Sequence, residues 1–159
     1  MATTIVASPL TVTVTENITL SGKKVGAVNS NVISGIKSID KSIVTATTDK
    51  LEYAAFGTGV DSGRRIYNEA NVRYIRITNK DDANFVVLFF TNESSDEVAI
   101  KLDFGQSFIW NGDLSGGVVD TMDANSGGAA STGQLADITK IQMQADTASV
   151  DVEIFIASV

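Results

Sequence analysis

The stretch that decides the fold lies near the end of the chain and reads Val150-Asp151-Val152-Glu153-Ile154-Phe155-Ile156. Every even position is aliphatic, and two of the three odd positions are acidic. Successive side chains of a β-strand point to opposite faces of a sheet, so this alternation predicts a strand with one buried and one wet face. Similar alternation recurs along the chain, and an all-β protein is therefore expected.

The alternation is also clear between positions 10 and 20, where the even positions are apolar apart from Glu16 and most odd positions are threonine. We expect one long strand with Glu16 at a wet edge, because no Gly or Pro marks a turn there. A turn at Glu16-Asn17 is the alternative. The polar sequence Ser21-Gly22-Lys23-Lys24 follows and predicts a turn.

The segment 32–47 gives two conflicting signals. Its isoleucines recur at helical intervals: Ile33, Ile36, Ile39 and Ile43. Gly35 and many serine and β-branched residues oppose a helix. Short strands over 32–39 and 42–47 are preferred, with a helix of one or two turns as the alternative. A further strand is expected over 51–56.

The middle of the chain predicts a β-hairpin. Residues 72–78 alternate, Asn79-Lys80-Asp81-Asp82 forms a turn, and residues 85–90 are continuously apolar. An unbroken apolar run is typical of a strand covered on both faces, so this strand is expected to be central. Val87 and Phe89 are accordingly placed in the core.

The region 111–134 holds six glycines and few large apolar residues. A loop of this length inside a compact domain is normally functional or ordered by a partner. Apart from this loop, the sequence contains eight to ten expected strands with short turns. This pattern predicts an antiparallel β-sandwich, preferably of jelly-roll type, over residues 10–159, with residues 1–9 as an N-terminal arm.

Composition argues against most chemistry. The 159 residues include no histidine and no cysteine, which removes the commonest general base and metal ligand and the thiolate nucleophile. The net charge of −7 and the scattered basic residues argue against nucleic acid. No segment resembles a signal peptide or is long enough to span a bilayer, so a soluble protein that does not bind membranes is expected.

Carboxylates are the only candidate catalytic groups. Asp113, Asp120 and Asp123 lie in the glycine-rich loop, and a retaining glycosidase needs two carboxyls roughly 5 Å apart. Residues 120–127 lack the ligand spacing of a calcium loop. We interpret these acids as solvated turn residues and expect no catalytic residue, no metal site and no cofactor, hence no enzyme.

The aromatic residues allow two interpretations. Six are concentrated in one region, and these are Phe85, Phe89, Phe90, Phe104, Phe108 and Trp110. They could stack on sugars, but such a cluster is more often core. Tyr53, Tyr67 and Tyr74 are the better surface candidates, although their spacing indicates nothing specific.

Three segments carry a family resemblance. They are Tyr74-Ile75-Arg76-Ile77-Thr78-Asn79, the strand from Phe85 to Asn92, and the segment from Ala99 to Phe108. The last segment contains the sequence Lys101-Leu102-Asp103-Phe104-Gly105-Gln106-Ser107-Phe108. Together they resemble small β-rich virion structural proteins of tailed bacteriophages, cyanophage-like ones especially. The resemblance spans about residues 72–110. It implies a virion protein assembled in the host cytoplasm.

Within that class, the resemblance and the acidic composition favour a capsid decoration (cement) protein. The expected partners are copies of the chain itself, as a trimer, and the major capsid protein or other virion proteins. A tail or head–tail connector component is the alternative within the class. A carbohydrate-binding module of a phage fibre is the alternative from another class.

Two regions fit a lone domain poorly, and both are expected to form interfaces. Ile5 and Val6 precede the first strand with few apolar neighbours. The glycine-rich loop carries its own isolated apolar residues, Leu114, Val118, Val119 and Met122. Ordering either region in a monomer would cost conformational entropy with little burial in return. We therefore expect these six residues to pack against other copies or the shell protein.

Overall fold

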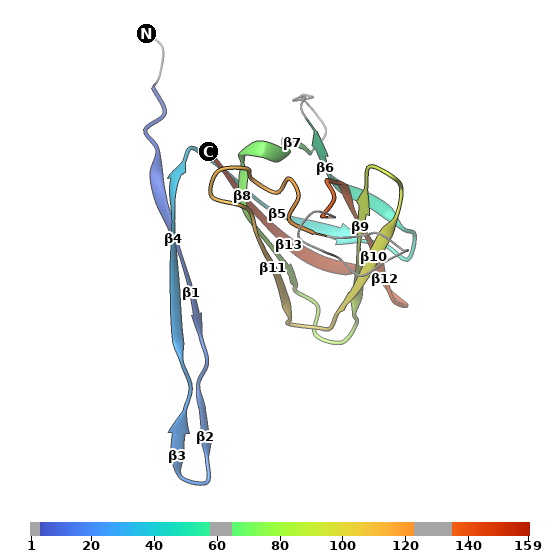
Figure 1. Ribbon diagram of the computed structural model, residues 1–159. Helices are drawn as coiled ribbons and strands as arrows, with labels where there is room; N and C mark the ends of the chain where they lie inside the picture. The colour runs from blue at the N-terminus through green and yellow to red at the C-terminus, as the bar shows by residue number, and fades with distance from the viewer. Residues whose placement is uncertain (1–3, 58–64, 123–134) are drawn as a thin grey trace.

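The computed structural model describes residues 4–57, 65–122 and 135–159, which form an almost entirely β-structure (Figure 1). The strands are β1 (Ser8–Thr15), β2 (Ile18–Leu20), β3 (Lys23–Val25), β4 (Val28–Ile36), β5 (Ser38–Ala46), β6 (Leu51–Gly57), β7 (Ile66–Asn68), β8 (Val72–Asn79), β9 (Val86–Asn92), β10 (Glu97–Leu102), β11 (Ser107–Asn111), β12 (Ile138–Ala145) and β13 (Val150–Ser158). Within these ranges the only helical element is the 3-10 turn η1 (Glu69–Asn71). The predicted all-β class is confirmed.

Two sheets pack face to face to form a sandwich. The five-stranded sheet has the order β10-β9-β12-β6-β7, and the four-stranded sheet has the order β11-β8-β13-β5. All neighbouring strands in both sheets run antiparallel except β6 and β7, among the residues described. Strands β4 and β5 cover residues 32–36 and 38–46, so the strand interpretation of segment 32–47 is confirmed, with the break at residue 37 and not at 40–41.

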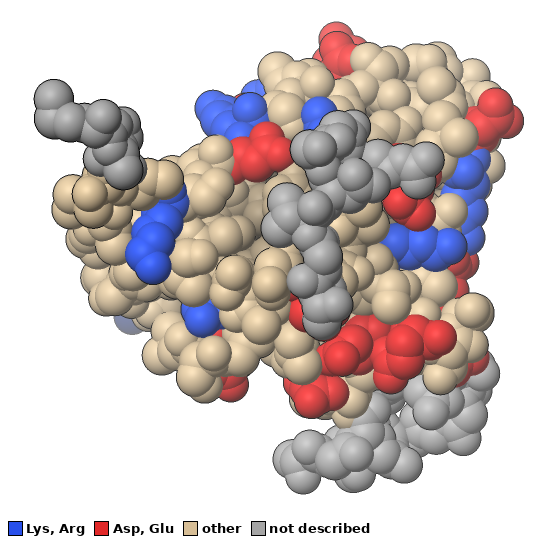
Figure 2. Space-filling view, turned by 90° about the horizontal axis from the view of Figure 1, so that it is seen from above, with Lys and Arg blue, Asp and Glu red and all other residues tan. Residues whose placement is uncertain are grey.

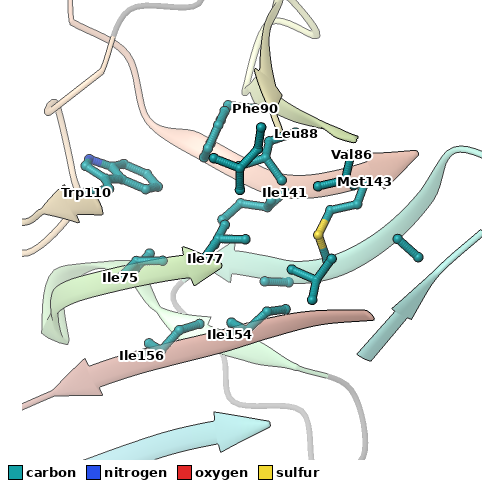
Figure 3. Packing of buried hydrophobic residues seen from close by; sticks show 14 of the residues in the cluster. Ile75, Ile77, Val86, Leu88, Phe90, Trp110, Ile141, Met143, Ile154 and Ile156 are labelled. Atoms are coloured by element: carbon teal, nitrogen blue, oxygen red, sulfur yellow. The ribbon is translucent and has the colours of Figure 1, made fainter. Parts of the chain in front are cut away.

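The core lies between the two sheets, where alternate residues of each strand meet (Figure 3). Val152, Ile154 and Ile156 of β13 point inward, as the opening stretch predicts. They face a layer from the five-stranded sheet, which includes Leu88 and Phe90. Each large aliphatic side chain buried in this way contributes about 1.5–3 kcal/mol, so the alternation of the sequence is the main source of stability.

The predicted hairpin between residues 72–78 and 85–90 is wrong. Strands β8 and β9 exist, but they lie in opposite sheets, and their connection crosses the edge of the sandwich. The fully buried Asn79 stabilises this connection. Its side-chain amide donates to the carbonyl oxygen of Asn84 at 2.9 Å and to that of Leu102 at 3.1 Å. Local periodicity predicted both strands but could not identify their partners.

The expected burial of Val87 and Phe89 is also wrong. Only the even positions of β9 point into the core, so Val87 and Phe89 are half-buried on the outer face of the five-stranded sheet. The ammonium group of Lys50 lies 4.1 Å from the centre of the Phe89 ring and covers it in part. The apolar run is therefore sheltered on its outer face by a long cationic side chain.

Residues 8–36 form a long hairpin that stands away from the sandwich (Figure 1). We call this element, built from β1 to β4, the hairpin arm. The expected strand over 10–20 is interrupted at Glu16-Asn17 but does not turn there. The turn lies at Ser21-Gly22, within the predicted segment 21–24. The sandwich itself begins at β5.

Candidate assembly interface

The hairpin arm is one continuous ladder in spite of its interruption. Thr15 lies opposite Val28 and Ile18 opposite Val25, so three steps along each strand connect the two ladders without a slip. Between them the amide of Glu16 donates to the carbonyl of Ala27 at 2.8 Å. A side chain at position 26 would overlap the Glu16 carbonyl, so the strands can approach this closely only because residue 26 is glycine.

One face of the arm carries apolar side chains from its base to its tip, together with the polar Asn31, Asn29 and Lys23 that pair with Val12, Val14 and Leu20. Directly paired residues of an antiparallel ladder point to the same side, and the register therefore assembles one set of side chains. We call this set the apolar arm face: Leu10, Val12, Val14, Ile18, Leu20, Val25 and Ile33. The opposite face carries Val28 and Val32 among mainly hydroxyl side chains, of which Thr13 and Ser30 are 2.9 Å apart.

The base of the arm is anchored on the outer face of the four-stranded sheet. A small separate core joins Ile33 and Ile36 of the arm to Tyr74 and Ala157 of the sheet. Towards the tip, the apolar arm face loses this cover, and the exposed fraction rises from 48% at Val14 to 54% at Ile18 and 65% at Leu20. The outer half of the arm therefore exposes several large apolar side chains to water.

A groove runs between the arm and the sheet. Two adjoining hollows of about 290 Å³ each share Val12 and Ile109 in their walls. The remaining apolar walls are Leu10 and Val14 from the arm and Tyr74 and Phe155 from the sheet. The rings of Tyr74 and Phe155 meet edge to face at 5.9 Å between their centres, which fixes the floor of the groove.

Beyond the groove, the outer face of the four-stranded sheet carries two exposed isoleucines on the edge strand β5. Ile39 is 56% exposed and Ile43 is 62% exposed. They flank a small charged cluster, in which Glu153 pairs with Arg76 at 2.5 Å and with Lys41 at 3.4 Å. The hydrogen bond and charge of Arg76, followed by those of Lys41, lower the pKa of Glu153.

The six residues predicted to form interfaces fall into different environments. Ile5, Val6 and Leu114 are exposed. Val118 is 1% exposed and belongs to the core of its own sandwich, while Met122 packs against that core and Val119 is half-buried. Val118 is thus not available to a partner. Its burial follows from Gly117, whose positive φ and close approach to η1 turn the chain inward.

Sequence reasoning missed the exposed tip of the arm, formed by Ile18, Leu20 and Val25. Their alternation was visible and predicted a strand, but a strand of a sandwich would bury that face. The signal that distinguishes the tip is the scarcity of apolar neighbours around the turn at 21–24. The same scarcity of apolar neighbours distinguishes Ile5 and Val6.

Two of the three candidate acids of the glycine-rich loop lie at turns in the described part of the chain. The carboxylate of Asp113 accepts bonds from the amides of Ser115 and Gly116 and from the Ser115 hydroxyl, which lowers its pKa. Asp120 sits in a turn with its amide bonded to Asp137, and Asp123 lies outside the described residues. The described residues contain no group of three or more Asp or Glu that could hold a metal ion.

Three of the six clustered aromatic residues, Phe90, Phe108 and Trp110, belong to the core or pack against it, whereas Phe85, Phe89 and Phe104 do not. Trp110 is buried against Phe56 and Phe90, and its indole nitrogen donates to Thr121. Of the three tyrosines, Tyr74 is buried, while Tyr53 and Tyr67 are half-buried and donate to the Thr45 carbonyl and the Asp40 carboxylate. Burial, followed by the Asp40 contact, raises the pKa of Tyr67.

The chain was compared with protein-family models, curated proteins and solved structures. No family model, no curated protein and no solved structure matches it. Within the described ranges, no helix has the length and apolar character that crossing a membrane requires. The hairpin arm and the sheet face beside it are therefore the features from which a function can be argued.

Proposed function

We propose that this chain is a structural protein of a tailed-phage virion, specifically a capsid decoration (cement) protein that stabilises the head through non-catalytic contacts. The observation that carries the proposal is the hairpin arm, which presents an apolar face beyond the body of the sandwich. The resemblance to virion structural proteins supports it independently, because it rests on residues 72–110, which contribute β8 to β11 and not the arm.

The properties of the arm favour a role in binding over that of an unbound appendage. A two-stranded hairpin is marginally stable by itself in water, and an exposed apolar stripe on it favours association. Bound to other proteins, the arm would bury this stripe. When copies of the chain bridge neighbouring shell subunits, the buried area must be exposed again before those subunits separate, and the head is stabilised by mass action.

The charge distribution is compatible with a position on the outer surface of a head. The chain has 19 acidic and 12 basic residues, and acidic side chains gather in a patch on the face shown in Figure 2. Such a surface repels packaged DNA and favours solubility. It therefore suits a protein added to the outside of the shell.

The proposal is tested by adding the purified chain to DNA-free heads that lack it and sedimenting them. Binding should saturate at a fixed ratio of chain to shell subunit. A tip variant, Ile18→Ser with Leu20→Ser, should bind much less, whereas Phe104→Ser should bind normally, because Phe104 is an equally exposed apolar residue at a turn of the sandwich. Absence of saturable binding to heads would refute the decoration role.

Further binding measurements on the same purified chain distinguish the alternative functions. Saturable binding to purified tails or connectors, without binding to heads, would assign the chain to those parts of the particle. Saturable and competitive binding on a glycan array would assign it to a carbohydrate-binding module. A decoration protein is expected to give neither result.

A further inference from the structure

We propose that the outer half of the hairpin arm docks on the four-stranded sheet of a second copy of this chain. In this contact the arm tip, with the adjacent Lys23, packs on Ile39 and Ile43 of the neighbouring copy. The inference goes beyond the proposed function, because it concerns contacts between copies and holds whether or not those copies bind a head.

The first argument is the area of exposed surface. The chain exposes 9371 Å². A compact monomer of 16.8 kDa would expose about 7,650 Å², which leaves an excess of roughly 1,700 Å². A standard interface removes about 800 Å² from each partner. The projecting arm contributes to this excess, and one contact of standard size would remove about half of it.

The second argument is continuity with a contact that the chain already makes. In the four-stranded sheet, Tyr74 pairs with Ala157, and Ala157 pairs with Ile39. The base of the arm covers Tyr74 and Ala157 and leaves Ile39 and the nearby Ile43 exposed. An apolar strand face from another copy would continue this packing along the same sheet surface.

The third argument is charge complementarity. Residues 1–36 contain one acid, Glu16, and two bases, Lys23 and Lys24, so the arm has a net charge of +1 and the rest of the chain −8. Two sandwiches therefore repel each other, while an arm and a sandwich attract. Lys23 lies opposite Leu20 and so shares the apolar arm face. On the receiving sheet, Lys41 lies between Ile39 and Ile43 and is paired with Glu153. The acid left to meet Lys23 is Asp151, which is opposite Thr45 and accepts a hydrogen bond from its hydroxyl at 2.8 Å.

The resulting contact joins two different surfaces, the tip of one copy and the sheet of the next. Such head-to-tail contacts close into a ring when the rotation between copies fits, and continue as a filament when it does not. A trimer, expected from the resemblance, is one closed ring of this kind. The contact also predicts that each copy uses its arm and its sheet independently.

The test measures association of the full chain by sedimentation velocity over a range of concentrations. The tip variant and a sheet variant, Ile39→Ser with Ile43→Ser, should each weaken association by about tenfold or more, because each removes two apolar side chains from the contact. Phe104→Ser should associate like the wild type. All five substituted positions are exposed, so the variants should keep the wild-type circular dichroism and melting temperature.

Mixing the variants gives a sharper readout. The tip variant keeps an intact sheet, and the sheet variant keeps an intact tip. An equimolar mixture should therefore form a one-to-one heterodimer and nothing larger, at concentrations where each weakened variant stays monomeric alone. If both variants associate like the wild type, or if the mixture remains monomeric while the wild type associates, the proposed contact is wrong.

The absence of cysteine from the chain permits a direct check of the contact. Mild oxidation of a mixture of Leu20→Cys and Ile43→Cys chains should give a mixed disulfide dimer in high yield. Leu20→Cys with Phe104→Cys should give little. Equal yields would overturn the proposal.

Failure of this inference can be distinguished from failure of the decoration role. A wild-type chain that stays monomeric and still saturates heads would refute the contact between copies and make the shell protein the occupant of the arm. A chain that forms the tip-to-sheet contact but does not bind heads would support the inference and refute the decoration role alone.

Discussion

Phe89 and Phe90 are adjacent in β9 but lie in opposite environments. Phe90 is fully buried, with ring centres of Phe108 and Trp110 at 5.1 and 5.8 Å. Phe89 faces outward beneath the ammonium group of Lys50. Residue type is the same in both positions, so their contributions to stability depend on the face of the strand alone.

This difference gives a matched pair of substitutions. Phe90→Ala should lower the free energy of unfolding by about 3–5 kcal/mol, as large-to-small core changes do. Phe89→Ala should cost roughly half of that or less, because the ring is only half-buried. Chemical denaturation of both variants measures the two costs. Equal losses would show that the inward face of β9 is misassigned.

Two glutamates should respond to pH with opposite signs. Burial, followed by the nearby charges of Asp137 and Glu93, raises the pKa of Glu69, so its charged form opposes folding. Arg76 and Lys41 lower the pKa of Glu153, so its charged form favours folding. The destabilisation by charged Glu69 is fully present above the pKa of Glu69 in the folded state. The stabilisation by charged Glu153 is fully present above the pKa of Glu153 in the unfolded state.

At pH 7, Glu69→Gln should therefore raise the melting temperature and Glu153→Gln should lower it. The gain from Glu69→Gln should vanish as the pH falls below the unfolded pKa of glutamate, where both states are protonated. The loss from Glu153→Gln should vanish as the pH falls through its lowered folded pKa. Melting curves from pH 7 to pH 2 measure both trends, and differences that persist at pH 2 would contradict the electrostatic explanation.

At the scale of whole elements, the arm should be the least stable part of the chain. Its outer half has two strands and no packing partner within the described molecule. Amides of β2 and β3 should exchange with deuterium rapidly in dilute solution and slowly after assembly. Amides of β13, paired on both sides by β8 and β5, should exchange slowly in both. Equal protection of β3 and β13 in the dilute chain would argue against this view of the arm.

The sequence predicted where strands form better than how they pair. Alternation placed β1, β8 and β13 because the period-two pattern is a local consequence of burying one face. It could not show that β8 and β9 occupy different sheets, since a crossing connection and a hairpin turn have similar polar sequences. The decisive feature, the buried amide of Asn79, depends on a carbonyl from Leu102, which is distant in sequence.

The candidate interface was predictable only in part. Ile5 and Val6 were correctly expected to lack cover, because few apolar residues surround them in the sequence. Val118 was placed at a partner surface because its loop is poor in apolar residues, yet Gly117 directs it into the core. The exposed face of the arm was missed, because alternation shows that a strand has an apolar face but does not show what covers it.

At the scale of the whole molecule, the chain combines an acidic sandwich with a weakly basic apolar arm. Its excess surface and its unequal charge distribution both favour association over an isolated existence. The proposed role uses these properties mechanically: many weak contacts, repeated over a shell, add to the stability of the whole particle.

The measurement that tests this account most directly is the temperature at which DNA-free heads open, followed by light scattering with and without saturating protein. The wild-type chain and Phe104→Ser should raise the opening temperature by the same amount. The tip variant should raise it much less at the same total concentration, because the contacts of the arm are lost. Heads that bind the wild-type chain in stoichiometric amounts but open at an unchanged temperature would contradict the account.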